Sequence, residues 1–125
     1  MRLLTLIAIC LALTSCAKKV TTSSGVVGSW QRTETLMDIG NGSGQWSPVP
    51  PADQVVVSFR PNGSIVHNGH WYLSRFERYA LLSDKELRLY SATDSLTLTY
   101  SFEDKLTINF QCIEACRDRF TRVEE

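Results

Sequence analysis

Leu96-Thr97-Leu98-Thr99-Tyr100-Ser101-Phe102 is the stretch that decides the fold class, because leucines and aromatic residues alternate with hydroxyl side chains along it. A repeat of two residues is typical of a β-strand that has one buried face and one solvated face. Turn-forming residues precede the stretch at Thr93-Asp94 and follow it at Glu103-Asp104-Lys105. The stretch therefore predicts one strand of an antiparallel sheet, with a strand turned back on either side of it.

Similar patterns, bounded by turn signals, predict about eight short strands and no helix after the amino-terminal segment. The predicted strands cover residues 28–36, 54–60, 65–67, 70–82, 87–90, 96–102, 106–110 and 117–123. In segment 70–82 apolar residues occur on both parities, so either both faces are partly apolar or a β-bulge shifts the register. The pattern predicts an all-β fold, and its meander order favours a small up-and-down antiparallel barrel over a two-layer β-sandwich.

Residues 38–53 are predicted to form a long loop, because glycine, asparagine, serine and proline cannot sustain a helix or an inner strand there. Loops of about sixteen residues in compact domains are usually lids, binding loops or disordered segments. The loop carries one large aromatic residue, Trp46. Trp46 is therefore a candidate for contact with a ligand or a partner.

The amino-terminal segment has the features of a secretory signal, since an apolar run over residues 3–13 follows Arg2 and ends in Leu13-Thr14-Ser15-Cys16. The run is too short for a membrane-spanning helix, which needs about twenty apolar residues. Leu-Thr-Ser-Cys resembles the bacterial lipobox, in which the cysteine receives a diacylglyceryl group, becomes the first residue after cleavage and is usually N-acylated. The alternative is an ordinary secretory signal with a cysteine near its cleavage site.

The lipobox resemblance implies that Cys16 is a lipid anchor, because two or more acyl chains such as palmitate hold a protein stably on a membrane. Residues 1–15 are then a signal peptide, residues 16–25 the lipidated cysteine with a flexible tether, and residues 26–125 the folded domain. Ala17-Lys18-Lys19 lacks the aspartate that retains such proteins at the inner membrane of some bacteria. The favoured localisation is therefore the outer membrane of a bacterial cell envelope.

The charges give no sign of a nucleic-acid partner. The chain has 13 basic and 13 acidic residues, and loss of the one basic residue in the signal leaves 12 against 13, a net charge of −1. A domain that grips phosphates shows a basic stripe, whereas here only Arg117, Arg119 and Arg122 cluster. Because these arginines alternate with Asp118 and Phe120, an outward face of the last strand is favoured over an anion site.

Cys112 and Cys116 are the cysteines left for the folded domain, since Cys10 leaves with the signal and Cys16 is the expected anchor. In an oxidising envelope such a pair is expected to form a disulfide. If Ile113-Glu114-Ala115 is the tip of a hairpin, the two cysteines face each other within bridging distance. A redox or metal role is the alternative, but the spacing is Cys-x-x-x-Cys and no histidine lies nearby in sequence.

The sequences of the first and the last predicted strand both resemble one protein family. Gly28-Ser29-Trp30, which opens the first strand, is similar to the Gly-x-Trp signature of lipocalins, and Phe120-Thr121-Arg122-Val123 looks like the closing strand of small bacterial lipocalin-like lipoproteins. The resemblance implies a lipocalin-like barrel behind the lipobox signal. It also implies that Arg122 stacks on Trp30 at the closed end, a cation–π contact of about 0.5–2 kcal/mol.

By that resemblance, the first functional hypothesis is a barrel that binds a small apolar or amphipathic molecule in its open mouth, with residues 38–53 as a lid. The candidate ligand-binding residues are aromatic, with Trp46 over the entrance and five others on the wall: Phe59, Trp71, Tyr79, Tyr100 and Phe110. The alternative is that these rings fill the interior, because an eight-stranded barrel is only just wide enough for one small ligand.

The second hypothesis is a non-enzymatic interaction protein, an inhibitor or assembly factor with a filled barrel, in which Trp46 anchors an envelope protein. The alternative for Trp46 is packing against its own barrel. An enzyme has the least support, because the sequence contains no Gly-x-Ser-x-Gly elbow, phosphate loop or His-Glu-x-x-His motif. His67 and His70 could hold a metal with Asp53, but solvated turn histidines are far commoner, so neither a metal nor a cofactor is predicted.

Overall fold

The computed structural model describes residues 25–38, 40–111 and 115–124, and this part of the chain consists mostly of β-strands. The elements are β1 (Gly28–Met37), β2 (Trp46–Pro48), the 3₁₀ helix η1 (Pro51–Asp53), β3 (Val56–Phe59), β4 (Ile65–His67), β5 (Arg78–Leu81), β6 (Glu86–Tyr90), β7 (Ser95–Phe102), β8 (Leu106–Gln111) and β9 (Ala115–Val123). No helix in the described ranges is long and apolar enough to cross a membrane. The predicted all-β class is confirmed, and β2 is a strand that the sequence patterns missed.

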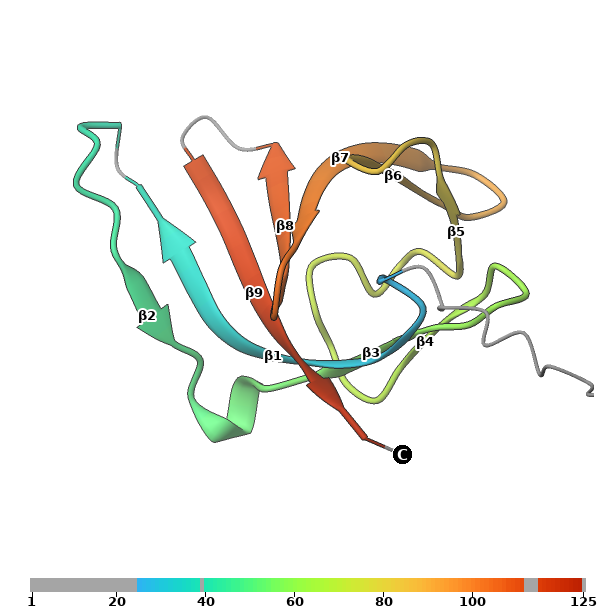
Figure 1. The fold of residues 1–125 in the computed structure, drawn as a ribbon, viewed down its shortest axis with the longest axis horizontal. Helices are drawn as coiled ribbons and strands as arrows, with labels where there is room; N and C mark the ends of the chain where they lie inside the picture. The colour runs from blue at the N-terminus through green and yellow to red at the C-terminus, as the bar shows by residue number, and fades with distance from the viewer. Residues whose placement is uncertain (1–24, 39, 112–114, 125) are drawn as a thin grey trace, which may run out of the picture.

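The strands form one antiparallel sheet in the order β4-β3-β1-β9-β8-β7-β6-β5, while β2 pairs with β1 outside this path. The first and last strands of the chain, β1 and β9, are paired along most of their length. The two outer strands, β4 and β5, meet at a bridge between Ser64 and Arg78, where the Ile65 N–H donates to the Glu77 carbonyl at 2.8 Å. The sheet is therefore a nearly closed up-and-down barrel rather than a two-layer sandwich (Figure 1).

β1 connects the two ends of the barrel, since its ten residues span about 30 Å. One edge of β1 pairs with β9, and the other pairs first with β3 and then, over residues 34–36, with β2. A register shift between Arg32 and Glu34 marks a β-bulge, which reverses the side to which the following residues point. Trp30 and Arg32 therefore face the interior, whereas Glu34 faces outward, where it binds Arg119 and Lys105.

The predicted strand 70–82 is wrong over most of its length, because only Arg78–Leu81 forms a strand. The preceding residues form turns, with the Ser74 N–H donating to the Trp71 carbonyl at 2.9 Å and the Phe76 N–H to the Leu73 carbonyl at 3.1 Å. Trp71, Leu73 and Phe76 are at most 5 % exposed, and the segment crosses the barrel in Figure 1. Apolar residues on both parities thus belong to a plug, residues 68–77, that fills the interior.

The predicted long loop 38–53 is only partly a loop. Its second half contains β2, which pairs with β1 through Leu36 and Trp46, and then the 3₁₀ helix η1. In the first half, the Asp38 carboxylate accepts the N–H groups of Gly40 and Gly42 at 2.9 and 3.2 Å. These contacts are local, whereas pairing with β1 holds residues 46–48 along the edge of the sheet, so this part of the segment is not a lid over the barrel mouth.

Candidate functional site

The end of the barrel at which the described chain begins is sealed by Trp30, which is fully buried. The Arg122 guanidinium carbon lies 4.3 Å from the Trp30 ring centroid, so the contact implied by the family resemblance is present. The same guanidinium donates to the Gly25 and Val27 carbonyls at 2.9 and 3.2 Å. Gly28 makes this approach possible, since a Cβ built there would lie 2.5 Å from Arg122 Nη1 and its φ of +139° suits glycine alone.

The middle of the barrel is filled by three of the residues that the sequence suggested for a cavity wall. Phe59 and Tyr79 pack edge to face with ring centroids 5.1 Å apart. The Tyr79 hydroxyl donates to the Arg60 carbonyl at 2.5 Å, and the Tyr100 hydroxyl to the Ser83 carbonyl at 3.1 Å. Phe59, Tyr79 and Tyr100 are thus packed and hydrogen-bonded within the protein, and their burial raises the pKa of both tyrosines.

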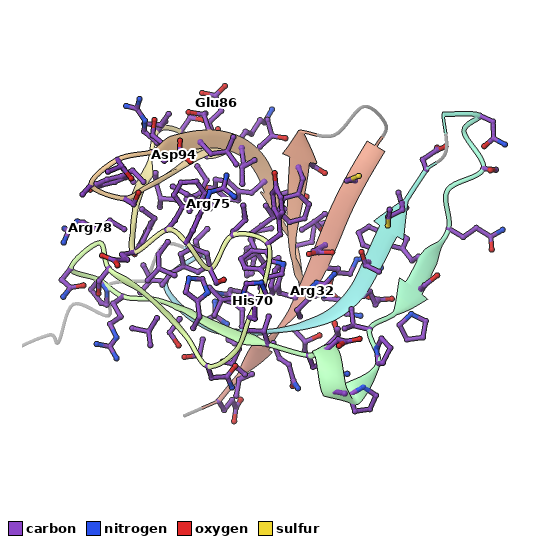
Figure 2. All side chains as sticks on the ribbon, turned by 180° about the vertical axis from the view of Figure 1, so that it is seen from behind. Arg32, His70, Arg75, Arg78, Glu86 and Asp94 are labelled. Carbon is purple, nitrogen blue, oxygen red and sulfur yellow. The ribbon has the colours of Figure 1, made fainter. Side chains whose placement is uncertain are left out.

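A cavity of about 700 Å³ opens at the opposite end, which we call the mouth cavity. It is bounded by the second half of β1, residues 52–55 around the end of η1, residues 69–72 of the plug, and the facing ends of β8 and β9. Trp71 and Phe110 line it, so two of the six candidate residues are at this cavity. Figure 2 labels Arg32 and His70, which come from β1 and the plug and both line this cavity.

The floor of the mouth cavity carries a buried carboxylate, Asp118, which is 4 % exposed. Arg32 donates to it twice, from Nε at 2.8 Å and from Nη2 at 3.2 Å, and Trp71 Nε1 donates at 2.9 Å. A buried charge is costly unless it is paired and hydrogen-bonded, and here three donors meet that requirement. The contacts also tie β1, β9 and the plug together, so the floor is held rigid from three segments.

The rim of the mouth cavity is open to solvent and partly apolar. Met37 and Tyr72 line the cavity and are 73 % and 60 % exposed. Phe110 connects the rim with the floor, since its ring centroid lies 6.1 Å from that of Tyr72 and 5.9 Å from that of Trp71. The exposed polar residues of the rim are Asp53, His70 and Arg117. The cavity thus offers a charged floor, an aromatic wall and a mixed rim.

Trp46 does not lie over the entrance, because β2 holds it on the outer side of the sheet. The Arg119 guanidinium carbon is 3.8 Å from the centre of its ring. Glu34 in turn accepts hydrogen bonds from Arg119 Nη1 and Lys105 Nζ, each at 3.2 Å. Burial alone would raise the pKa of Glu34, but the hydrogen bonds and charges of these two residues outweigh it and lower that pKa. Trp46 therefore packs on its own barrel, which was the alternative to a partner anchor.

The two histidines have different surroundings. His70 is exposed on the rim, whereas His67 is half-buried, with Nε2 3.2 Å from the Phe76 carbonyl oxygen. Its Nδ1 is buried and has no hydrogen-bond partner among the described residues. Burial lowers the pKa of His67, and the hydrogen bond to Phe76 opposes this only in part. No group of three or more metal-ligating side chains is gathered within residues 25–38, 40–111 and 115–124.

Of the cysteines, Cys16 and Cys112 lie outside the described residues, and Cys116 lies at the start of β9 beside the mouth cavity. In the β8–β9 ladder Cys116 is opposite Phe110, and Ala115 is opposite Gln111. The predicted hairpin tip at residues 113–115 is therefore wrong at Ala115, which belongs to β9. The lipidation of Cys16 and the bridge between Cys112 and Cys116 stay predictions.

Asp118, at the floor of the mouth cavity, is a candidate site residue that the sequence patterns did not single out. It shares its parity along β9 with buried Phe120, so a carboxylate on the inward face was visible in the sequence. Its partners come from residues 86 and 47 positions earlier in the chain, Arg32 and Trp71. No alternation pattern predicts such distant pairing. Comparison with known proteins adds no relative, since no protein-family model, curated protein or solved structure matches the chain.

Proposed function

We propose that the protein is a lipid-anchored lipoprotein of the bacterial envelope whose barrel binds one small apolar or amphipathic molecule in the mouth cavity. The observation that carries the proposal is a cavity of about 700 Å³ with an aromatic wall above the part-buried Arg32–Asp118 pair. Ligand sites are concave and mostly apolar, with a few fixed polar groups that orient the bound molecule. The mouth cavity combines these properties, and its size lies in the usual range for small ligands.

The proposed membrane anchor and envelope localisation rest on the sequence of the amino-terminal segment, with its short apolar run and Leu13-Thr14-Ser15-Cys16. Incorporation of labelled palmitate by cells expressing the full chain tests the anchor. We expect the label in the wild-type protein and its loss in Cys16→Ser, with the unlabelled variant released from the membrane fraction. A wild-type protein that carries no acyl chain would refute the anchor and leave the binding proposal to be judged separately.

Extraction of the protein from its native envelope tests the binding proposal. We expect organic solvent to release a small molecule from the wild-type protein, identified by mass spectrometry. Thr35→Trp places a bulky ring in the cavity and should abolish the yield, because Thr35 lines it. Thr97→Trp is the control, since Thr97 lies on the exposed outer face of β7. Equal yields from both variants, or no molecule from the wild type, would contradict the proposal.

The second candidate is a non-enzymatic interaction module with a filled barrel. It is supported by the packing of Phe59, Tyr79 and Tyr100 and by the plug, which leave the middle of the barrel without space. The same extraction separates the two candidates. An empty protein that co-purifies with one envelope protein in constant stoichiometry supports this second function, and a bound small molecule supports the first.

A further inference from the structure

The unused hydrogen-bond donors of Arg32 are the feature of the mouth cavity that points to a ligand chemistry. An arginine side chain has five N–H donors. Two of them bind Asp118, and the described residues provide no acceptor for the other three. The side chain lines the cavity and keeps 20 % of its surface exposed. Donors of a fixed cation are thus present at the floor, below the aromatic wall.

Building on the proposed function, we propose that the ligand is a linear monocarboxylate that binds head-first, with its carboxylate on Arg32 and its apolar tail directed out of the cavity. The planar guanidinium matches a carboxylate with two parallel hydrogen bonds, and charge-assisted bonds of this kind are about twice as strong as neutral ones. Asp118 does not occupy the remaining donors of Arg32, because its two oxygens are bound to Nε and Nη2 of that side chain and to Trp71 Nε1.

The opposite orientation, with the tail at the floor, is disfavoured by the same donors. An apolar chain laid against Arg32 would remove water from its N–H groups and supply no acceptor in return, which is costly for a charged group. Beyond the floor, Leu73 and Phe76 of the plug are fully buried, so the packed interior offers a tail no further depth. Arg32 itself offers no acceptor to a cationic head group, because a guanidinium only donates hydrogen bonds.

The rim provides a surface for the tail. The thioether of Met37 and the ring of Tyr72 are exposed beside the cavity, and Phe110 lies between them and Trp71. Exposed large apolar side chains at the edge of a concave site are typical of surfaces that cover a ligand. The tail would leave the floor along Phe110 and contact Met37 and Tyr72 at the opening.

Titration calorimetry of the full chain with decanoate, 1-decanol and decylamine tests the head group, because the three share one chain. We expect decanoate to bind at least about tenfold more tightly than the other two, a difference of about 1.4 kcal/mol. Arg32→Lys keeps a cation for Asp118 but loses the planar fork, so it should weaken decanoate at least about tenfold and change decanol little. Arg119→Lys, on the outer face, is the control and should change neither.

Nuclear Overhauser contacts test the orientation on the unmodified protein. We expect the terminal methyl group of bound decanoate to contact the Met37 methyl group and the C2 methylene to contact the Trp71 indole. Binding of all three compounds with equal affinity, or contacts in the reverse order, would overturn the head-first inference and leave the proposed function standing. Failure of all three compounds to bind, together with an empty native extract, would overturn both.

Discussion

Replacement of Asp118 by asparagine tests whether the buried ion pair at the cavity floor stabilises the fold as its geometry indicates. The change removes the charge that faces Arg32 and keeps a single acceptor oxygen for the donors of Arg32 and Trp71. Removal of one partner from a buried pair costs about 3–5 kcal/mol, because the other charge stays buried without compensation. Arg32 keeps 20 % of its side chain exposed, so water offsets part of that cost. We expect a loss of about 2–3 kcal/mol, just below that range, because Arg32 is only partly buried.

Urea unfolding followed by tryptophan fluorescence measures this loss directly. With a slope of about 1.5 kcal/mol per molar urea, the midpoint should fall by about 1.5 M. Glu34→Gln is the matched control, since it also neutralises a carboxylate bound to two cations, but on the outer face, with 27 % of the side chain exposed. Exposed pairs contribute about 0–1 kcal/mol, so its midpoint should fall by less than about 0.7 M. Equal losses for the two variants would refute the reasoning that burial makes Asp118 special.

Three further predictions concern the closed end, the contact between β4 and the plug, and the outer face. Gly28→Ala should lower the free energy of unfolding by about 2 kcal/mol, because a Cβ would overlap the Arg122 guanidinium and strain the backbone at φ +139°. An unchanged urea midpoint would contradict this expectation. The pKa of His67 is lowered by burial, so its neutral form stabilises the fold above the usual value of 6.5, and that contribution is lost as the pH falls below it. His67→Gln should therefore make the melting temperature fall less between pH 7.5 and pH 5 than it does in the wild-type protein. An unchanged pH profile would count against a buried neutral His67 ring. His70→Gln, on the exposed rim, is the control. Trp46→Ala should cost about 1 kcal/mol in urea unfolding, since it removes the cation–π contact with Arg119; no loss at all would favour a partner-binding role for this ring.

The parts of the fold that depend on simple alternation could be predicted from the sequence. Along β7 and β8 the leucines, Ile108 and Tyr100 face the core because no irregularity interrupts the period of two. At β1 the same reasoning would place Glu34 beside Trp30 on the inner face. The bulge between Arg32 and Glu34 reverses the parity, and it arises from pairing with β9, which is distant in sequence.

The plug and the site show why other parts could not be predicted. Trp71, Leu73 and Phe76 are apolar on both parities, a pattern that indicates burial on all sides but does not distinguish a buried strand from turns inside a barrel. The composition of residues 38–53 predicts Trp46 over the barrel entrance. Its observed position on the outer face instead follows from the pairing of Trp46 with Leu36 and from the stacking of Arg119 on its ring. Composition identifies aromatic candidates for a cavity, and tertiary packing decides which of them fill the interior.

The position of Gly25 has a consequence for how a ligand would arrive. Gly25 is bound by Arg122 at one end of β1 and β9, and the rim of the mouth cavity at Met37 lies at the other end of β1, about 30 Å along the strand. If acyl chains on Cys16 hold the sealed end toward the bilayer, the opening points into the aqueous space. A ligand would then be exchanged with a soluble carrier or a facing membrane, and lateral delivery from the leaflet that holds the anchor would be prevented by geometry.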